Sequence, residues 1–381
     1  MFKNSGTNIF CAIILILMIL FSLISANAKQ PSESSISVSA RSAALYQPDT
    51  KRFVFSKNGK RRLSMASTTK IMTALVALEN ISSLDDAIVI DERAVGTEGS
   101  SAYLKAGEVV TAEELLYALL LQSANDAAVA LAIHVGGSIE CFADMMNERA
   151  DKMALSDTHF ENPHGLDENG HYTTAEDLAK IAAEALQNET FRLVASTYKK
   201  TIVNEERQRT YVNHNKLLNL YDGAIGVKTG YTDKSGRCLV GAAERDGVRL
   251  ISVTLDAPSD WEDHKRLLDY GFECFTSVKL ADVYELHYDV PLIDDEGNTL
   301  SVANVDELSS VCEGEVGKIE RNLNLPRFIS GSVKKGEIVG TVQFTVGGKD
   351  AGTLNLIALE DTAENKEKKN FFERIFDKLF S

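Results

Sequence analysis

Apolar and polar residues alternate with two different periods along the chain, and the change of period divides it into regions. Between residues 42 and about 276 both periods occur. Short apolar runs on either side of a turn predict β-hairpins at 43–55 and 239–255. Apolar residues spaced three and four apart predict helices over 68–79, 113–135, 174–186 and 262–270. Strands at both ends with helices between them indicate an α+β domain in which the terminal strands share one sheet.

Between about residues 278 and 360 the helical period disappears. Short apolar runs at 283–288, 338–344 and 352–358 are separated by the turns Asp-Glu-Gly-Asn, Lys-Lys-Gly and Gly-Gly-Lys-Asp. This pattern is typical of a small all-β domain. A chain of 381 residues also exceeds what one core ordinarily uses. We therefore expect two domains, at 36–276 and 278–360, without an internal repeat.

The chain ends in a polar linker, residues 361–369, and an apolar-rich segment, residues 370–381. Phe371, Phe372, Ile375, Phe376, Leu379 and Phe380 recur at steps of one, three and four. A helix would gather these side chains on one face. Residues 366–380 carry five basic and three acidic side chains. Such an amphipathic helix is too short to span a bilayer but suits a membrane surface. The alternative is that it packs on its own β domain.

The first 28 residues have the order of a secretory signal peptide. Lys3 precedes an uncharged apolar run over about residues 9–24, and Ala26-Asn27-Ala28 follows as a cleavage pattern. A permanent membrane anchor is the alternative, because a run of this length is close to the minimum for spanning a bilayer. In both cases the rest of the chain is exported and lies on the extracytoplasmic side of the membrane.

The charge and the cysteines narrow the class of protein. The formal net charge is −15, and it becomes −16 when the signal peptide leaves with its one lysine. A balance this acidic argues against nucleic acid as a partner. Cys11 leaves with the signal, and Cys141, Cys238, Cys274 and Cys312 are far apart, with no C-x-x-C. Free and mostly buried thiols are expected, with one or two disulfides as the alternative.

Ser67-Thr68-Thr69-Lys70 is an S-x-x-K motif at the start of an apolar helix. Three residues make nearly one helical turn, so the Ser67 hydroxyl and the Lys70 amine would share a face. A serine hydroxyl is a weak nucleophile unless a base lies within hydrogen-bond reach. Burial or a nearby cation lowers the pKa of a lysine enough to make it such a base. The motif alone arises easily by chance, and Ser67 as a simple helix cap is the alternative.

Two further motifs follow in order along the chain. Ser123-Ala124-Asn125 lies between two apolar helical runs and would present a hydroxyl and an amide together. Lys228-Thr229-Gly230 lies on a short strand predicted over 225–231. Its lysine supplies a cation, its threonine a hydroxyl for a carboxylate, and its glycine room for a substrate backbone to approach. Three motifs in this order indicate a serine acyl-transfer enzyme.

With these motifs the chain resembles the penicillin-binding proteins, and more closely the low-molecular-mass serine D-Ala-D-Ala carboxypeptidases. Residues 66–73, Asn162-Pro163-His164-Gly165-Leu166 and residues 226–232 carry the resemblance, which covers about residues 42–276. The resemblance implies an α+β fold, a catalytic domain of the penicillin-binding and β-lactamase type with an antiparallel sheet and a helical subdomain. A small all-β domain and an amphipathic tail helix also fit the family's layout.

The resemblance also implies a reaction. Ser67 would attack the carbonyl between the two terminal D-alanines of a peptidoglycan stem peptide, with Lys70 as base, and water would then release the shortened peptide. The other expected site residues are Ser123 and Lys228 for proton relay, Asn125 and Thr229 for the substrate amide and carboxylate, and Gly230 and Tyr231 on the substrate-binding strand. The backbone N–H groups of Ser67 and Tyr231 would form the oxyanion hole. β-Lactam antibiotics would acylate Ser67, and no metal or organic cofactor is expected.

Departures from the family pattern bear on substrate binding. The middle residue of the second motif is Ala124 where the family motif has Asp. Asp256-Ala257-Pro258-Ser259 follows the last strand, where some relatives place an Arg for the substrate carboxylate, and Arg237 is a speculative substitute. His164 is interpreted as a structural loop residue, because Ser/Lys chemistry does not require a histidine.

Two alternatives belong to other classes of protein. A class A β-lactamase shares S-x-x-K and K-T-G, but residues 156–188 lack the Glu-containing segment that would activate its deacylating water. The β domain and the tail also disfavour it. A binding or sensor domain would capture β-lactams or wall peptides without turnover, and release of D-Ala from a pentapeptide distinguishes an enzyme from it.

Overall fold

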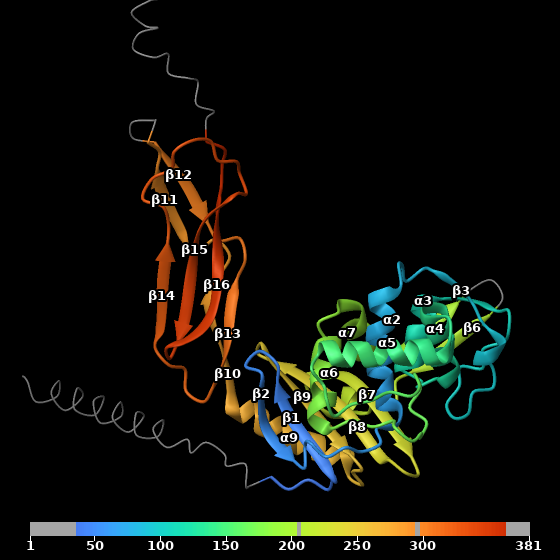
Figure 1. Cartoon of the computed structure of the whole chain (residues 1–381). Helices are drawn as coiled ribbons and strands as arrows, with labels where there is room; N and C mark the ends of the chain where they lie inside the picture. Colours follow the sequence, from blue (N-terminus) through green and yellow to red (C-terminus); the bar gives the residue numbers. More distant parts are fainter. Residues whose placement is uncertain (1–35, 204–206, 294–297, 363–381) are drawn as a thin grey trace, which may run out of the picture.

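The computed structural model of the protein describes residues 36–203, 207–293 and 298–362 (Figure 1). The signal peptide expected at 1–28 and the amphipathic helix expected at 370–381 lie outside these residues. Figure 1 shows one body of mixed helices and strands and a second, elongated body of strands. Within the described part no single helix is long and apolar enough to cross a membrane. Only the bent pair α4 (Asn125–Gly136) and α5 (Ile139–Lys152), at 82° to each other, meets those criteria together.

The first body is built on a five-stranded antiparallel sheet with the order β2-β1-β9-β8-β7. The strands are β1 (Ser42–Gln47), β2 (Arg52–Lys57), β7 (Ala224–Thr232), β8 (Gly236–Arg245) and β9 (Val248–Leu255). Because β1 pairs with β9, the first and last strands of this domain share the sheet, which confirms the predicted α+β arrangement. The strand with the K-T-G motif, β7, lies at one edge.

Helices cover both faces of this sheet. α9 (Asp260–Cys274) packs on one face through a cluster that includes Leu239 and Leu267. α6 (Ala175–Ala185) packs on the other face, against β1 and β9. The remaining helices of the helical subdomain are α2 (Lys70–Asn80), α3 (Ala112–Leu120), α4, α5 and α7 (Glu189–Ser196). The helical period over 113–135 is divided between α3 and α4, because the chain leaves the helix at the S-x-N motif.

Shorter elements connect these helices. They are η2 (Ala66–Thr69), the β3 (Ala87–Val89) and β4 (Val109–Thr111) pair, η3 (Glu92–Ala94), the β5 (Lys199–Val203) and β6 (Gln208–Val212) hairpin, and α8 (Leu217–Leu220). Side-chain oxygens of Thr111, Ser138, Thr174 and Asn188 accept a backbone N–H three residues on, at the starts of α3, α5, α6 and α7. Each cap satisfies one of the donors that a helix start leaves unpaired.

The second body is an all-β domain, as predicted. Its main sheet has the order β11-β12-β16-β15-β14, and β10 pairs with β13. The strands are β10 (Phe275–Ala281), β11 (His287–Pro291), β12 (Thr299–Ala303), β13 (Leu308–Glu313), β14 (Ile319–Asn324), β15 (Ile338–Val346) and β16 (Lys349–Ala358). Its core is apolar and includes Leu300, Val342, Phe344 and Leu356.

One strand prediction is wrong in position, because the run at 283–288 becomes a strand only at His287. The Glu285 N–H donates to the Asp282 carbonyl at 3.1 Å, and the Glu285 carboxylate accepts from the Asp282 N–H at 2.9 Å. Tyr284 has a φ of 59° in this turn. The turn uses backbone groups that a strand would need for pairing, so the local hydrogen bonds prevail over the apolar pattern.

The chain passes from α9 into β10 between Cys274 and Phe275, with no residue between the two elements. Arg52 of β2 and Glu313 of β13 form an ion pair across this junction. The two domains are therefore joined by a direct helix-to-strand connection and by a side-chain contact.

The described cysteines are free thiols, as expected. Cys238 and Cys274 are buried, Cys312 is half-buried and Cys141 is exposed. The expectation that most are buried therefore holds for two of the four.

Candidate active site

Ser67 lies in the 3₁₀ turn η2, immediately before α2. Two threonine hydroxyls stabilise this turn, because Thr68 donates to the Met65 carbonyl at 2.6 Å and Thr69 donates to the Ala66 carbonyl at 2.7 Å. Ala66 has a φ of 47°, in the left-handed region that residues with a side chain rarely adopt. Such strain persists where the surroundings determine the backbone, and it is common at functional sites.

The loop that follows α5 holds the serine turn from outside. Gly165 has a φ of 90°, and a Cβ built there would lie 2.0 Å from the Ala66 carbonyl oxygen, so only glycine fits. His171 Nδ1 accepts the Glu161 N–H at 3.1 Å. Nε2 of the neutral ring therefore carries the hydrogen and donates to Thr69 Oγ1 at 2.8 Å. Burial lowers the pKa of His171 to about 4, which keeps this ring neutral above that pH.

Lys70 is fully buried, three residues beyond Ser67. Its Nζ lies 2.9 Å from Ser67 Oγ, 2.6 Å from Asn125 Oδ1 and 2.6 Å from the His164 carbonyl oxygen. Both carbonyl oxygens can only accept hydrogen bonds. A neutral amine would give them its two hydrogens and keep its lone pair for the proton of Ser67. The geometry therefore suits a general base.

The electrostatics of the site favour this neutral amine. Burial, and after it the charge of Lys228, lowers the pKa of Lys70 well below its ordinary value, while the carboxylate of Asp126 opposes the shift. Burial also lowers the pKa of Lys228 to about 7. Two buried lysines near one serine are thus each easier to deprotonate than a lysine in water.

Asp126 is a residue that the motif analysis missed. Its buried carboxylate accepts the Ser101 hydroxyl at 2.6 Å and the backbone N–H groups of Ala102 and Leu104 at 2.9 and 3.1 Å. It thereby ties the loop before β4 to the first turn of α4. An acid directly after the S-x-N motif, at the start of a helix, was the available signal for this role.

Asn125 and Ser123 differ in how they meet the lysines. Asn125 contacts Lys70 directly, whereas within the described residues the Ser123 hydroxyl makes no hydrogen bond to Lys70 or Lys228. Ser123 has a φ of 62° and is 5% exposed. A strained and buried turn between α3 and α4 therefore fixes its backbone two residues before Asn125.

Strand β7 brings the K-T-G motif to the serine turn. A Cβ built on Gly230 would lie 3.0 Å from the Ser67 backbone nitrogen and 3.1 Å from that of Thr68. Lys228 is two residues earlier and therefore on the same side of the strand. It is 1% exposed, and its amine donates to the Thr229 carbonyl at 2.9 Å. The edge strand thus places the cation of the motif beside the turn that carries the nucleophile.

Tyr231 and Arg237 are partners across β7 and β8. Tyr231 is 63% exposed, and its hydroxyl donates to Asp233 at 3.1 Å. The Arg237 guanidinium is paired with Asp260 at 2.8 Å and lies over the Trp261 ring. Arg237 is therefore already neutralised, and the structure does not support it as the substitute cation for a substrate carboxylate.

His164 acts in the site through its backbone. Its carbonyl accepts from Lys70, and its ring Nδ1 accepts the Leu166 N–H at 3.2 Å. Burial, followed by the charge of Lys70, lowers the pKa of this imidazole to about 3. A neutral ring that supports its own loop agrees with the interpretation of His164 as a structural residue.

A sequence model described as D-alanyl-D-alanine carboxypeptidase matches residues 26–259, and a model of the C-terminal domain of penicillin-binding protein 5 matches residues 275–364. The chain belongs to the D-alanyl-D-alanine carboxypeptidase family. It is a serine-type carboxypeptidase that acts on the D-Ala-D-Ala ends of peptidoglycan, which confirms the resemblance drawn from its motifs. The β-lactamase and sensor-domain alternatives find no support in these matches.

Relatives of this carboxypeptidase match it over most of their length. DacF of Bacillus subtilis is 32% identical over 349 residues, which are 88% of this chain and 90% of the relative. DacC of Escherichia coli is 31% identical and covers 90% and 88%. The crystal structure of DacD from Francisella tularensis has a TM-score of 0.62 at 26% identity and covers 89% and 97%. The Streptomyces K15 DD-transpeptidase has a TM-score of 0.60 at 36% identity, over 62% of this chain and 98% of that one.

Proposed function

We propose that Ser67 is the nucleophile of this carboxypeptidase and that Lys70 is its base. Lys70 takes the proton of Ser67 Oγ as that oxygen attacks the carbonyl between the two terminal D-alanines. The peptide bond breaks, D-Ala leaves, and the rest of the peptide remains as an ester on Ser67. Water then attacks the ester and releases the shortened peptide. The observation that carries this proposal is the position of the Lys70 amine, 2.9 Å from Ser67 Oγ and 2.6 Å from each of two carbonyl oxygens that can take its hydrogens.

The other polar residues of the three motifs handle the proton and the substrate. Ser123 and Lys228 deliver a proton to the leaving amine, so that D-Ala departs as a neutral amine. Asn125 binds the amide of the substrate, and Thr229 binds its terminal carboxylate. The low pKa of Lys228, about 7, supports proton delivery near neutral pH.

The oxyanion of the tetrahedral intermediate is bound by the backbone N–H groups of Ser67 and Tyr231. Such a donor is worth about 3 kcal/mol of transition-state stabilisation. The close approach of Gly230 to the Ser67 backbone nitrogen supports this assignment, because it brings the strand and the serine turn to one point. A larger residue at 230 would separate the two donors.

Release of D-Ala from a D-Ala-D-Ala pentapeptide tests the proposal, with Ser67→Ala as the control. We expect the purified wild-type protein to release D-Ala and to retain fluorescent penicillin after denaturation, because β-lactams acylate the same serine. Ser67→Ala should do neither. A protein that retains penicillin but releases no D-Ala would be a capture domain, and the proposed turnover would be wrong.

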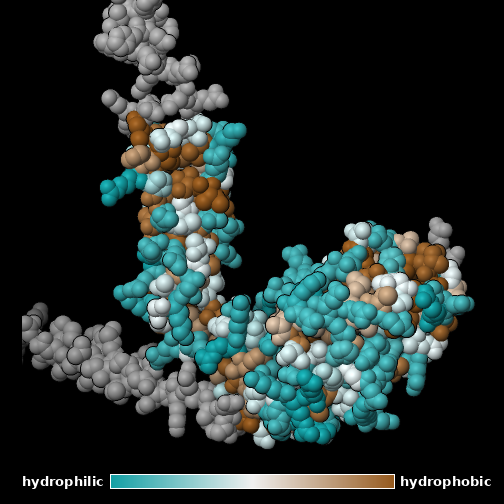
Figure 2. All heavy atoms as spheres, viewed as in Figure 1, coloured by the Kyte–Doolittle hydropathy of each residue, from teal (hydrophilic) through white to brown (hydrophobic). Residues whose placement is uncertain are grey.

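We also propose that the exported protein is bound peripherally to the outer face of the cytoplasmic membrane through residues 370–381. The chain leaves the β domain after β16, at the end away from the catalytic domain. Ile293, Phe328 and Ile338 are 51%, 53% and 62% exposed. Ile338 pairs with Ile357 near the end of β16, and Ile293 donates its N–H to the Ile329 carbonyl, next to Phe328. Apolar side chains also gather toward this end in Figure 2, which suits contact with lipid.

Deletion of residues 370–381 tests this attachment. After signal cleavage, the full-length protein should sediment with membranes, whereas the truncated protein should stay in the supernatant. D-Ala release from a soluble pentapeptide should be equal for both, because the deletion is remote from Ser67. A truncated protein that still sediments with membranes would contradict the proposal.

A further inference from the structure

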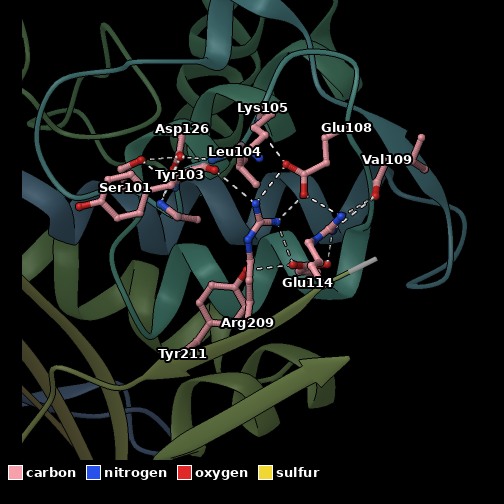
Figure 3. A network of polar contacts seen from close by, with 12 residues as sticks. Ser101, Tyr103, Leu104, Lys105, Glu108, Val109, Glu114, Asp126, Arg209 and Tyr211 are labelled. Carbon is pink, nitrogen blue, oxygen red and sulfur yellow. Dashed lines mark hydrogen bonds and ion pairs between the residues drawn. The ribbon is translucent and has the colours of Figure 1, made fainter. Parts of the chain in front are cut away.

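Two arginines and two glutamates form a largely buried cluster in the helical subdomain (Figure 3). Arg209 lies 2.6 Å from Glu108 and 3.3 Å from Glu114, and Arg207 lies 2.7 Å from Glu108 and 2.9 Å from Glu114. None of the four side chains is more than 17% exposed. The Tyr211 hydroxyl donates to Glu114 at 3.0 Å. Two cations thus neutralise two carboxylates in this site, which is called the Arg–Glu cluster below.

The Arg–Glu cluster joins three separate segments of the chain. Its arginines belong to the β5–β6 hairpin, Glu114 belongs to α3, and Glu108 ends the loop 98–108. Arg209 also donates to the Tyr103 carbonyl in that loop, at 3.2 Å. The Lys105 N–H donates to the Glu108 carboxylate at 2.9 Å. These contacts fix one end of the loop on the hairpin and on α3.

The other end of the loop is bound to the catalytic site. The Asn125 N–H donates to the Ser100 carbonyl at 2.7 Å, and the Asn125 side-chain amide donates to the Glu98 carbonyl. Gly99 has a φ of 93°, and a Cβ built there would lie 2.7 Å from Asn125 Nδ2. The amide cannot turn while it makes these contacts, so the loop determines where its oxygen meets Lys70.

The β5–β6 hairpin also reaches the site along a second route. Two residues after β6, the His214 N–H donates to the Leu121 carbonyl at 3.1 Å. Leu121 lies two residues before Ser123. A shift of the hairpin would therefore move the backbone before Ser123 through Leu121 and the side chain of Asn125 through the loop.

We propose that the Arg–Glu cluster positions the Asn125 amide against Lys70, by fixing the loop 98–108 on the β5–β6 hairpin. The inference rests on the roles proposed above for Asn125 and Lys70. The four residues of the cluster are positioning residues, because their contacts are with the hairpin, the loop, β4 and α3. Arginine suits this task because its planar guanidinium holds two oxygens in a fixed geometry. The ammonium group of a lysine does not hold them in this way.

Arg209→Met tests the proposal, with Arg149→Met as a matched control. Arg149 is 17% exposed against 16% for Arg209, and it also forms two ion pairs, at 2.9 Å with Glu79 and at 2.6 Å with Glu184. Its two partners lie on α2 and α6, away from the loop. We expect Arg209→Met to lower the rate of acylation by fluorescent penicillin at least tenfold, and Arg149→Met to lower it less than twofold, at similar decreases in melting temperature.

Two further variants separate positioning from stability. Arg209→Met leaves buried carboxylates with half of their compensating charge, which is costly. Arg209→Met combined with Glu108→Gln removes one of those charges, so it should recover the melting temperature but not the acylation rate. Arg209→Lys keeps the charge without the fork and should recover acylation only in part. Hydrogen exchange at the Ala102 and Leu104 amides should increase in Arg209→Met and not in Arg149→Met.

Equal losses of acylation in Arg209→Met and Arg149→Met would overturn the proposal. So would a wild-type acylation rate in the double variant. Asn125→Ala distinguishes this failure from a failure of the proposed site. If Asn125→Ala is acylated at the wild-type rate, the role given to Asn125 is wrong, whereas an impaired Asn125→Ala beside an unimpaired Arg209→Met refutes the cluster alone.

Discussion

The interiors of the catalytic domain and the β domain are built from different kinds of residue. In the catalytic domain Lys70, Lys228, Asp126 and His264 are all at most 1% exposed. Among the described residues of the β domain, Asn304 is the one buried polar side chain. Its amide is fully used by backbone groups, with two hydrogen bonds donated to carbonyls and one accepted from an N–H.

The difference reflects what each domain has to do. An ionisable group is costly to bury unless it is paired, and it is retained where chemistry needs a shifted pKa. The two lysines near Ser67 are such groups. The proposed site residues all lie in the catalytic domain, so the core of the β domain follows the simple rule of buried apolar residues. Substitutions should therefore separate activity from stability in the first interior and change stability alone in the second.

The largest effect is expected from Lys70→Met. Loss of the base should lower acylation by penicillin about 10²–10⁴-fold. The free energy of unfolding should change by no more than about 2 kcal/mol, because removal of a desolvated amine offsets the two carbonyls left without a donor. Stopped-flow acylation and urea denaturation measure the two quantities. Acylation within tenfold of the wild type would show that another group takes the proton.

A pair of phenylalanines tests the comparison directly. Phe344 in the β domain and Phe191 in the catalytic domain are both 0% exposed, and substitution by Ala should cost about 3–5 kcal/mol in each. Phe344→Ala should leave kcat/KM for a soluble peptide within twofold of wild type. Phe191→Ala should lower it, because α7 packs on β7. Calorimetry and D-Ala release check both. Equal losses of activity would mean that the β domain supports the site.

The smallest effect is expected from acid, which should destabilise the catalytic domain before the β domain. His264 lies between the Ser252 and Thr254 hydroxyls, at 2.7 and 2.9 Å, and burial lowers its pKa to about 3. Below pH 6.5 His264 becomes protonated in the unfolded chain but stays neutral in the folded chain, so the free energy of unfolding decreases as the pH falls from 6.5 toward 3. The loss at pH 4 is on the order of 3 kcal/mol.

Urea denaturation between pH 7 and pH 4 measures this slope, and His264→Gln should make it shallower. Gln cannot take the proton, yet it can still hydrogen-bond to a hydroxyl. A slope that is the same in the variant would assign the acid sensitivity to other buried groups, of which His164 and His171 are the first candidates.

Residues that follow one another at a fixed spacing could be predicted from the sequence. Ser67 and Lys70 meet because three residues make nearly one helical turn, and the hairpins follow from apolar runs around turns. The spacing does not reveal that the serine turn is a 3₁₀ turn with a left-handed residue at Ala66. That conformation depends on Gly165, which is about a hundred residues away in the chain, so no local pattern encodes it.

The sequence could not predict contacts that site residues make with main-chain atoms or with distant segments. The second carbonyl on Lys70 belongs to the main chain of His164, and main-chain atoms leave no signature in residue types. The Arg–Glu cluster joins Glu108 and Glu114 to arginines about ninety residues later, and a surface charge pattern looks the same as a buried one. The turn at 282–285 shortens a predicted strand. It depends on the hydrogen bond that the Glu285 carboxylate accepts from the Asp282 N–H.

The direct connection between α9 and β10 has a mechanical consequence. A flexible linker would let the catalytic domain move through a volume that the length of the linker determines. Here the backbone continues from the helix at Cys274 into the strand at Phe275, and the Arg52–Glu313 contact braces the joint. No flexible linker therefore separates the two domains. When the far end of the β domain is fixed, Ser67 can reach stem peptides only within a narrow range of distances from that end. A longer or shorter β domain would select a different layer of the wall.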